Sequence, residues 1–478
     1  MSNVIALAGW PPEILAYAIA MYSRSGLSIQ QAINKITEEK SSKFFETFYF
    51  QYGHASIADN AHVALALEGI SQIASFEIED EQLWDGQERS TRFQSFDKDD
   101  AYMVPDSIRN TPLENDYNFI ATFLLERYRL YRDKCFEYLV SGNPKPQNMD
   151  QGTYERTLRA RAFDVARYWL FNGIRTSVGQ ITSARTLEKQ ISRLMSSEYR
   201  ECVDLAQRMK EVCQIKPFCP DGKDEGPVAP TLLKYTKPMR FITEVRKFIE
   251  EHVVLFNKFG PVNHRYVHLV RPLDINREIL ATYMYESSQR SYKWINGFVN
   301  DIPDRTVNVT LSEILEMRDH RDELTRHFVA GLPVQFDICM DIGGRRDIHR
   351  HRNCIQIHQR FTTLRGFDTP DLVKEIGMEA EYERNMQMVS EKIEDLRSKV
   401  GNSADYLIPF AFRAGTLYKM DTRQAIYMTE LRTKPQGHFS YREIAWEMDQ
   451  QFRQNILKGL DRHDRAISFF EETDIFKR

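Results

Sequence analysis

The two halves of this 478-residue chain carry matching residues in the same order, and this internal repeat constrains the fold more than any single motif. Three residues of the first half have identical partners 238 positions later, and the pairs are Tyr168 and Tyr406, Arg175 and Arg413, and Arg185 and Arg423. Upstream, Ala20–Ser25 is echoed by Tyr283–Ser288. Short matches arise by chance in a long chain, but their common order favours two copies of one fold.

A segment rich in proline and glycine separates the halves. Four prolines and two glycines lie between Lys216 and Pro230, and neither a continuous helix nor a central strand tolerates such a segment. At roughly 150 residues per domain, a chain of this length suggests two or three domains. We therefore expect a first copy at residues 1–215, a linker at 216–235 and a second copy at 236–478.

Each half also contains one long amphipathic pattern that ends in Gly-Asn. Between Thr369-Pro370 and Gly401-Asn402, apolar residues recur at spacings of four and three, at Tyr382, Met386, Val389, Ile393, Leu396 and Val400. In the first half the stripe precedes Gly142-Asn143 and consists of Ile120, Leu124, Tyr131, Cys135 and Tyr138. These patterns predict one long helix in each copy. Residues from about Pro144 to Phe163 are then an expected insertion in the first copy.

The overall composition excludes several classes of protein. With 42% hydrophobic and 28% charged residues, the chain is typical of a soluble globular protein, not a disordered or collagen-like one. Its formal net charge of −4 argues against a dedicated nucleic-acid binder. The N-terminus has no basic leader, and no stretch approaches the roughly 18 apolar residues of a spanning helix, so we expect a cytoplasmic protein with no membrane partner. Six cysteines without a Cys-x-x-Cys pair predict buried free thiols.

Any anionic ligand must therefore be met by local clusters of arginine, and the densest one is Arg345–Arg352. If this segment is extended, Arg350 and Arg352 point to one side and can clamp a phosphate or diphosphate. The same composition also fits a solvated basic face. A metal site at His349 and His351 ranks last, because the flanking arginines would repel a dication.

The first half has the opposite charge at the corresponding place, in the acidic run Glu77–Trp84. The segment Gln87–Phe93 follows, and in a strand or loop its Glu88, Ser90 and Arg92 point the same way. Ser90 and Arg92 suit a nucleotide phosphate, and Glu88 suits a ring N–H or a ribose hydroxyl. Surface salt bridges produce a similar composition, so the segment alone is a weak signal.

Taken in order, the two arginine-containing segments and three others resemble the flavin-dependent thymidylate synthases over most of both halves. The matching segments are Gly53–Asp59, Glu88–Phe93, Ala101–Pro105, Phe336–Arg352 and Asp421–Arg442. Gly53–Asp59 resembles a degenerate form of the family's histidine element, and Glu88–Phe93 and Ala101–Pro105 resemble the end of its signature and the residues after it. Phe336–Arg352 resembles the strand leading into Arg-His-Arg, and Asp421–Arg442 resembles the C-terminal element. The resemblance implies an α/β (α+β) fold, with an antiparallel sheet and long helices in each of two tandem copies.

The departures from the family pattern are complementary. The first half has lost Arg-His-Arg to Asp80-Glu81-Gln82, and the second half has Ile357–Phe361 where Ser-x-Arg is expected. Asn60 also stands where the family has a second histidine. Family members are homotetramers whose sites combine several subunits. The resemblance therefore implies that this chain forms a homodimer equivalent to a tetramer, with about half the usual number of sites.

The implied reaction is reductive methylation of dUMP to dTMP, with FAD as cofactor and NADPH and methylenetetrahydrofolate as co-substrates. By resemblance, Arg432 and Glu88 are catalytic, and the cofactor-binding residues are Arg350, His351, Arg352, His54, Ser56, Arg423 and His438. The substrate-binding residues are Gln87, Ser90, Arg92 and Arg432. Two alternatives stay open: a flavoprotein acting on another pyrimidine nucleotide, and a nucleotide-binding descendant without turnover.

Overall fold

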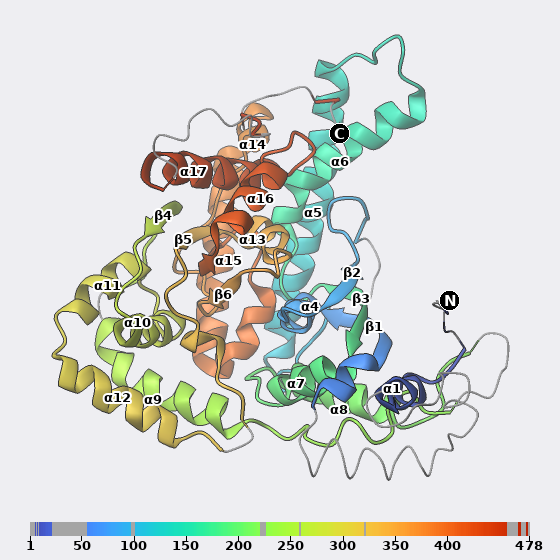
Figure 1. Cartoon of the computed structure of the whole chain (residues 1–478). Helices are drawn as coiled ribbons and strands as arrows, with labels where there is room; N and C mark the ends of the chain where they lie inside the picture. Colours follow the sequence, from blue (N-terminus) through green and yellow to red (C-terminus); the bar gives the residue numbers. More distant parts are fainter. Residues whose placement is uncertain are drawn as a thin grey trace. The chain divides into compact units, whose positions relative to one another are not determined.

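The computed structural model describes residues 5, 7, 9–21, 55–96, 101–219, 226–257, 260–319, 322–456, 467–469 and 475–476 (Figure 1). The chain is a mixed α/β protein that forms two compact units. The first unit comprises residues 1–69, 77–88 and 177–243, and the second comprises 70–76, 89–176 and 244–478. Within the described part, no helix combines the length and the apolar character needed to cross a bilayer.

The first unit contains a three-stranded sheet in the order β1-β3-β2, formed by β1 (His62–Ser71), β3 (Arg175–Ser183) and β2 (Asp85–Glu88). Strand β2 pairs antiparallel with β3 and places Gln87 opposite Gly179. Ser183 ends β3 and caps the next helix, because its side chain accepts a hydrogen bond from the Thr186 amide. The accompanying helices are α1 (Pro12–Ala20), η3 (Ala55–Asn60), α7 (Ala184–Leu194) and α8 (Arg200–Val212).

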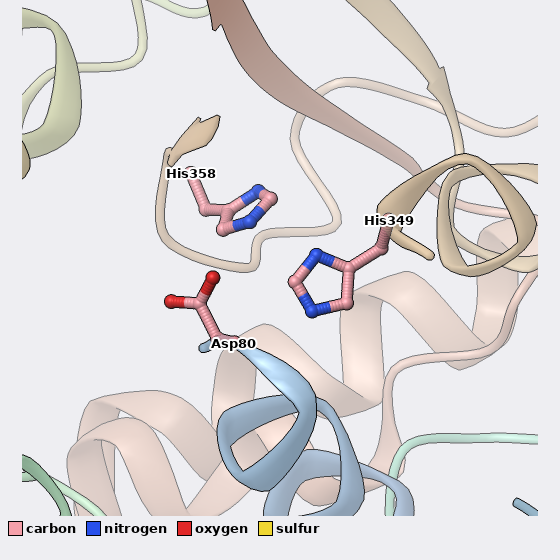
Figure 2. Close-up of side chains that lie close together, drawn as sticks. All are labelled: Asp80, His349 and His358. Carbon is pink, nitrogen blue, oxygen red and sulfur yellow. The ribbon is translucent and has the colours of Figure 1, made fainter. Parts of the chain in front are cut away.

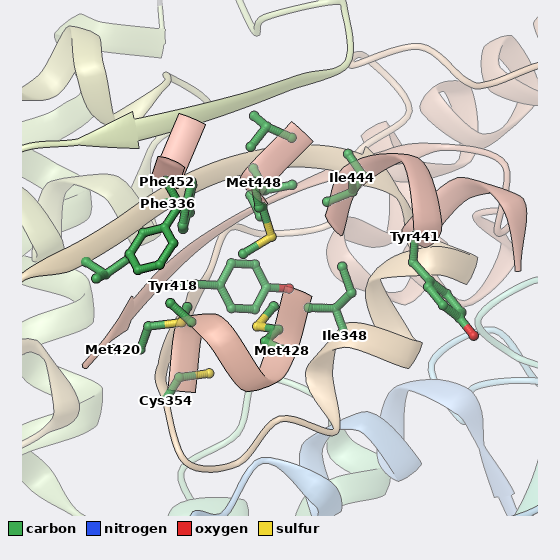
Figure 3. Packing of buried hydrophobic residues seen from close by; sticks show 14 of the residues in the cluster. Phe336, Ile348, Cys354, Tyr418, Met420, Met428, Tyr441, Ile444, Met448 and Phe452 are labelled. Atoms are coloured by element: carbon green, nitrogen blue, oxygen red, sulfur yellow. The ribbon is translucent and has the colours of Figure 1, made fainter. Parts of the chain in front are cut away.

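The second unit is built on a four-stranded antiparallel sheet in the order β4-β5-β7-β6. Its strands are β4 (Tyr266–Val270), β5 (Val334–Asp341), β6 (Ile355–His358) and β7 (Arg413–Met420). Every residue of β5 is buried, so both faces of this strand are covered. On one face Phe336 and Tyr418 pack with Met428 of α16 (Thr422–Arg432) and Met448 of α17 (Phe439–Asn455), as Figure 3 shows.

The remaining helices link or cover these sheets. They are α4 (Gln72–Glu79), α5 (Glu114–Gly142), α6 (Gln151–Ala166), η4 (Arg167–Trp169), α9 (Arg240–Asn257), α10 (Ile275–Ser287), α11 (Tyr292–Asn300), α12 (Asp304–Glu316), η5 (Arg326–Phe328), α13 (Ile342–His349), α14 (Asp371–Glu375), α15 (Glu379–Val400) and η6 (Gly401–Leu407). All six cysteines are free thiols, of which five are buried and Cys219 is half-buried. The expectation of buried free thiols is thus confirmed for those five.

Both predicted long helices are present, as α5 and α15. In α5, Leu124 and Tyr131 are buried as the stripe predicts, whereas Tyr138 is 40% exposed near the end of the helix. Helix α15 ends where Gly401 adopts a φ of +58°, a conformation that glycine accepts without steric cost. The predicted start at Thr369-Pro370 belongs to the separate short helix α14, because Gly377 has a φ of +73° and interrupts the helix.

The order of elements repeats along the chain. When α6 and the short helix α14 are left aside, the series β1, α4, β2, α5, η4, β3, α7, α8 has the same element types as β5, α13, β6, α15, η6, β7, α16, α17. Arg175 and Arg413 are the first residues of β3 and β7, and Arg185 and Arg423 are the second residues of α7 and α16. Among the described elements α6 has no counterpart after α15, and it occupies most of the region expected to be an insertion.

Two chain segments of the second unit meet around an approximate twofold axis. The Asn172 amide donates to the Ile408 carbonyl at 3.1 Å, and the Phe410 amide donates to the Leu170 carbonyl at 2.7 Å. These bonds exchange places when 238 is added to or subtracted from each residue number. The bridge between Phe171 and Pro409 joins two residues separated by the same interval. Such self-complementary contacts are the pattern that a twofold interface produces.

Candidate functional site

The basic segment 350–352 follows a helix instead of forming a strand, so the prediction of an extended segment is wrong. Asp341 ends β5 and caps α13 by accepting a hydrogen bond from the Gly344 amide at 2.6 Å. Helix α13 continues to His349, and the chain then turns. In this turn Arg350 is exposed, His351 is buried and Arg352 is half-buried. Because Arg350 and Arg352 lie in this turn, their guanidinium groups do not share one face of a strand.

Arg92 lies in a turn after β2 and is only 8% exposed. Its Nε and Nη2 donate to the two carboxylate oxygens of Asp164, at 2.6 Å and 3.0 Å. Nη2 also donates to the Gln436 carbonyl at 3.3 Å, and Nη1 donates to the Tyr441 hydroxyl at 3.4 Å. Burial alone would lower the pKa of Arg92, but the Asp164 carboxylate raises it above its usual value. Arg92 is thus permanently charged and held from three sides.

Arg432, the last residue of α16, donates from Nε to Nε2 of His351 at 2.6 Å. Burial and the positive charge of Arg432 lower the pKa of His351 well below its usual value. The ring is therefore neutral, and because Nε2 accepts from Arg432, its proton lies on Nδ1. The Gln424 side-chain amide lies 3.2 Å from that Nδ1, and its oxygen has to face the ring to accept from the Nδ1–H. The histidine of the Arg-His-Arg segment is thus a fixed acceptor for Arg432.

The positive charge of the site exceeds the negative charge. Arg167 donates from both terminal nitrogens to Asp347 at 3.1 Å. Burial would raise the pKa of Asp347, but four arginines lower it well below its usual range, namely Arg167, Arg350, Arg92 and Arg432. With Asp164 and Asp347 as the two carboxylates, four guanidinium groups leave a formal charge of +2. A phosphate monoester carries close to −2 at neutral pH and would match it.

His438 is buried next to the same groups and uses both of its nitrogens. Its Nδ1 accepts from the Ser440 amide at 3.2 Å and caps α17, so its Nε2 carries the proton and donates to the Asp164 carbonyl at 2.9 Å. Burial and the positive charge of Arg167 lower its pKa well below the usual value. The ring also stacks on Phe439, with 4.0 Å between the centroids. A cofactor contact through His438 would therefore involve the ring and not a free nitrogen.

The structure thus gathers five of the residues predicted from the sequence, Arg92, Arg350, His351, Arg432 and His438. Ser90 joins them because its hydroxyl accepts from the Arg92 amide at 3.2 Å. Arg352 is half-buried in the same turn as Arg350, and the other predicted residues are not placed at the site. Arg423 is exposed near the start of α16. Ser56, Gln87 and Glu88 belong to the first unit, where Ser56 and Gln87 are exposed. His54 lies outside the described residues.

His349, at the end of α13, faces His358, at the end of β6, as Figure 2 shows. Their ring centroids are 5.1 Å apart, with Nδ1 of His349 bonded to Gln356 and Nδ1 of His358 bonded to Thr416. Phe76 stacks on the His349 ring at 4.1 Å, and the Arg345 guanidinium lies 4.6 Å from the Phe76 centroid. His351 cannot pair with His349 as a metal ligand, because Arg432 occupies its Nε2.

Four site residues were missed by the sequence analysis: Asp164, Arg167, Asp347 and Tyr441. Asp347 lies inside the basic segment, where a lone carboxylate among arginines signals an internal ion pair. Arg167 adjoins the repeated Tyr168. Asp164 lies one residue beyond the expected insertion, and nothing in its surroundings in the sequence indicates that α6 brings it to Arg92.

Comparison with known proteins agrees with these motifs. The family model described as Thy1, thymidylate synthase complementing protein, matches residues 4–220 and 282–456. The chain belongs to the Thy1 family. This membership confirms the resemblance found in the sequence.

Similar proteins differ in how much of this chain they match. A UPF0159 protein of Chlamydia muridarum is 24% identical over 99% of this chain and 93% of that protein, and one of Thermoplasma acidophilum is 22% identical over 90% and 91%. A flavin-dependent thymidylate synthase of Clostridium tetani is 23% identical but matches only 48% of this chain, against 83% of its own length. A solved flavin-dependent thymidylate synthase of Helicobacter pylori, complexed with FAD and dUMP, is 15% identical with a TM-score of 0.31, and the match covers 48% of this chain and 95% of that one.

Proposed function

We propose that the chain consists of two tandem copies of one Thy1-family fold, at 1–215 and 236–478, joined by the linker 216–235. Three observations support this. The order of elements repeats along the chain. The hydrogen bonds between segments 168–173 and 406–411 form pairs that are related by the same interval of 238 residues. A single synthase of this family also aligns over most of its own length with about half of this chain. The copies interleave in space, since residues 89–176 of the first copy lie in the second unit.

We further propose that the protein is a flavin-dependent thymidylate synthase that methylates dUMP. The observation that supports this proposal best is that Arg92, from the first copy, lies with Arg432 and the turn 350–352, from the second, in a partly buried site of formal charge +2. Ser90 and Arg92 would bind the phosphate of dUMP. Arg432 would lie at a uracil carbonyl and stabilise the negative charge that develops on the ring.

The donor set of the second copy also fits an anionic flavin cofactor. Arg350 and Arg423 are exposed and Arg352 is half-buried, so their guanidinium groups are accessible to a diphosphate. When bound, FAD would supply the redox chemistry, with NADPH and methylenetetrahydrofolate as co-substrates. The protein groups would bind and orient the ligands. His351 would act by fixing Arg432, because both of its ring nitrogens already face protein groups.

A second candidate is a protein that binds a pyrimidine nucleotide without turnover. It is favoured by the way Arg92 is engaged, since Asp164, Gln436 and Tyr441 already accept from its nitrogens. A phosphate would then meet an arginine with little freedom to reorient. In either case we propose that two chains associate as the equivalent of the family's tetramer.

The deciding experiment is complementation of a thymidine-requiring bacterial strain, together with the visible absorbance of the purified protein. Growth without thymidine and a flavin absorption band are the expected results, and Arg432→Ala is expected to abolish growth. A protein that binds dUMP but does not support growth would leave the non-catalytic candidate. A protein that neither carries nor takes up FAD would contradict the enzyme function.

A further inference from the structure

We propose that Tyr441 is a positioning residue that sets the spacing between Arg92 and Arg432, the two arginines assigned to dUMP. This inference rests on the proposed function, which it deepens. The Tyr441 side chain comes from the first turn of α17, and the residue is 6% exposed. The Arg432 Cζ lies 5.4 Å from the ring centroid and the Arg92 Cζ lies 6.0 Å from it. Both distances are within the range of cation–π attraction.

A neutral spacer of this kind solves an electrostatic problem. Two guanidinium groups held near each other in a partly buried site repel, because the surroundings screen charge less than water does. Arg92 has a carboxylate partner in Asp164, whereas the Nε of Arg432 is bonded to a neutral imidazole. A second carboxylate between the arginines would attract both but would cancel charge that a phosphate needs. The π face of Tyr441 attracts both cations and leaves the formal charge at +2.

One connection of the chain controls both arginines. Helix α16 ends at Arg432, the segment 433–438 follows, and α17 begins at Phe439. The Gln436 carbonyl and the Tyr441 hydroxyl both accept from Arg92. The segment that presents Arg432 therefore also holds Arg92, so a shift of Tyr441 would change the spacing of the pair.

Gly437 shows how closely the ring is seated. A Cβ at this position would lie 2.7 Å from Cε2 of Tyr441 and 2.9 Å from its hydroxyl oxygen. It would also lie 2.8 Å from Cγ of Arg442. An alanine there would therefore crowd the Tyr441 ring and the Arg442 stem without replacing Tyr441, Arg92 or Arg432. The φ of Gly437 is not in the left-handed region, so the substitution would act through this contact and not through backbone strain.

The test is calorimetric binding of dUMP, and separately of inorganic phosphate, to the full chain and its variants. Tyr441→Phe keeps the ring and is expected to bind within about threefold of wild type. Tyr441→Met keeps a buried apolar side chain without a π face, and we expect about tenfold weaker binding. Gly437→Ala is expected to weaken binding similarly. Tyr382→Met is the control, because it removes a buried tyrosine ring of α15 in the same unit that contacts neither arginine.

Each outcome decides the inference. Wild-type affinity in Tyr441→Met would overturn it, and so would an equal loss in Tyr382→Met. An equal loss in Tyr441→Phe would also overturn it, because the hydroxyl and not the π face would then hold the arginines. Binding of phosphate but not dUMP by the wild type would contradict the proposed function, while the variants would still test the spacing with phosphate. Binding of neither probe by the wild type would contradict both.

Discussion

The Nε–H of Arg432 is hydrogen-bonded to Nε2 of His351 across 2.6 Å, so the arginine assigned to the substrate and the histidine of the Arg-His-Arg segment form one unit. The arginine can only donate, and the imidazole must stay neutral to accept. This pair links the end of α16 to the turn after α13. It makes the protonation state of His351 depend on the charge of its neighbour.

We therefore expect Arg432→Gln to raise the pKa of His351 toward its usual value. Burial is the larger cause of the low pKa and would remain, so the pKa should stay below that of an exposed histidine. NMR titration of the imidazole measures the shift. Arg423→Gln, an exposed change near the other end of α16, is the control. Equal His351 titration in both variants would contradict the coupling.

The ion pair between Arg92 and Asp164 should contribute strongly to stability. Both side chains are almost completely buried, with 10% and 3% of their surfaces exposed. Asp164→Asn would leave the Arg92 charge buried without its counterion, and we expect a loss of about 3 kcal/mol in the free energy of unfolding. Urea denaturation measures it. Asp395→Asn, which breaks the exposed pair with Lys399, should cause no measurable loss. Similar values for the two variants would contradict a structural role for Asp164.

Asp337 should give the second unit an unusual dependence on pH. Burial raises the pKa of this carboxyl to about 6, against the opposing hydrogen bonds from Tyr285, Tyr292 and Tyr266 and the charge of Arg365. A carboxyl with a raised pKa in the folded state contributes stability at low pH, and this contribution is lost as the pH rises through about 6. The loss is on the order of 2–3 kcal/mol.

Asp337→Asn removes this titration and isolates its effect. The free energy of unfolding of the wild type minus that of the variant should fall between pH 4 and pH 7. Other titrating groups, including His351 and His438, are common to both proteins and cancel in the difference. A difference that stays constant over this range would show that Asp337 does not titrate there.

Much of the fold was predictable because hydrophobic spacing and repeated residues are local signals. The apolar stripes of α5 and α15 predicted both long helices. Tyr168 and Tyr406, which the repeat pairs, lie in η4 and η6, and these hold the same position in the two series of elements. The turn at 350–352 was not predictable in this way. Arg350 and Arg352 suggested a strand, but the chain forms α13 because Asp341 caps it and the apolar side chains of Ile342 and Ile348 are buried.

The site was only partly predictable because its partners lie far apart in the sequence. Arg92 was identified by its motif, but its partners Asp164 and Tyr441 are 72 and 349 residues away. Only the packing of α6 and α17 brings them together. His438 was identified, yet its bonds to Ser440 and Asp164 make it a neutral cap of α17 rather than a free donor.

Lys419 and Glu278 form a fully buried ion pair in the second unit, with an N–O distance of 2.8 Å and no exposed surface on either side chain. Lys419→Met would leave the Glu278 carboxylate with only the Gln335 side chain and the Gly331 amide as donors. We expect destabilisation of about 3–5 kcal/mol. Adding Glu278→Gln to that variant should recover part of the loss, because no buried charge remains. Chemical denaturation of the single and double variants measures this, and additive losses would contradict it.

The approximate twofold contact gives a final test at the equivalent positions Gly173 and Ala411. Gly173 donates from its amide to the Tyr406 carbonyl, and the matching donor 238 residues later is Ala411, which bonds to Tyr168. A Cβ on Gly173 would lie 2.9 Å from the Tyr406 carbonyl oxygen and 3.0 Å from the Tyr117 hydroxyl. Alanine is accepted on one side of the axis, whereas on the other side the backbone approaches too closely.

Gly173→Ala should therefore destabilise the protein by about 1–3 kcal/mol, as overpacking of a close contact does. Amide exchange should also become faster at Asn172 and Phe410, whose hydrogen bonds lie beside the strained contact. Gly142→Ala is the matched control, since a Cβ at the end of α5 meets nothing within 4 Å. It should be neutral or slightly stabilising because alanine favours the helix. If both variants unfold at the same denaturant concentration, the close approach at Gly173 does not hold the two segments together.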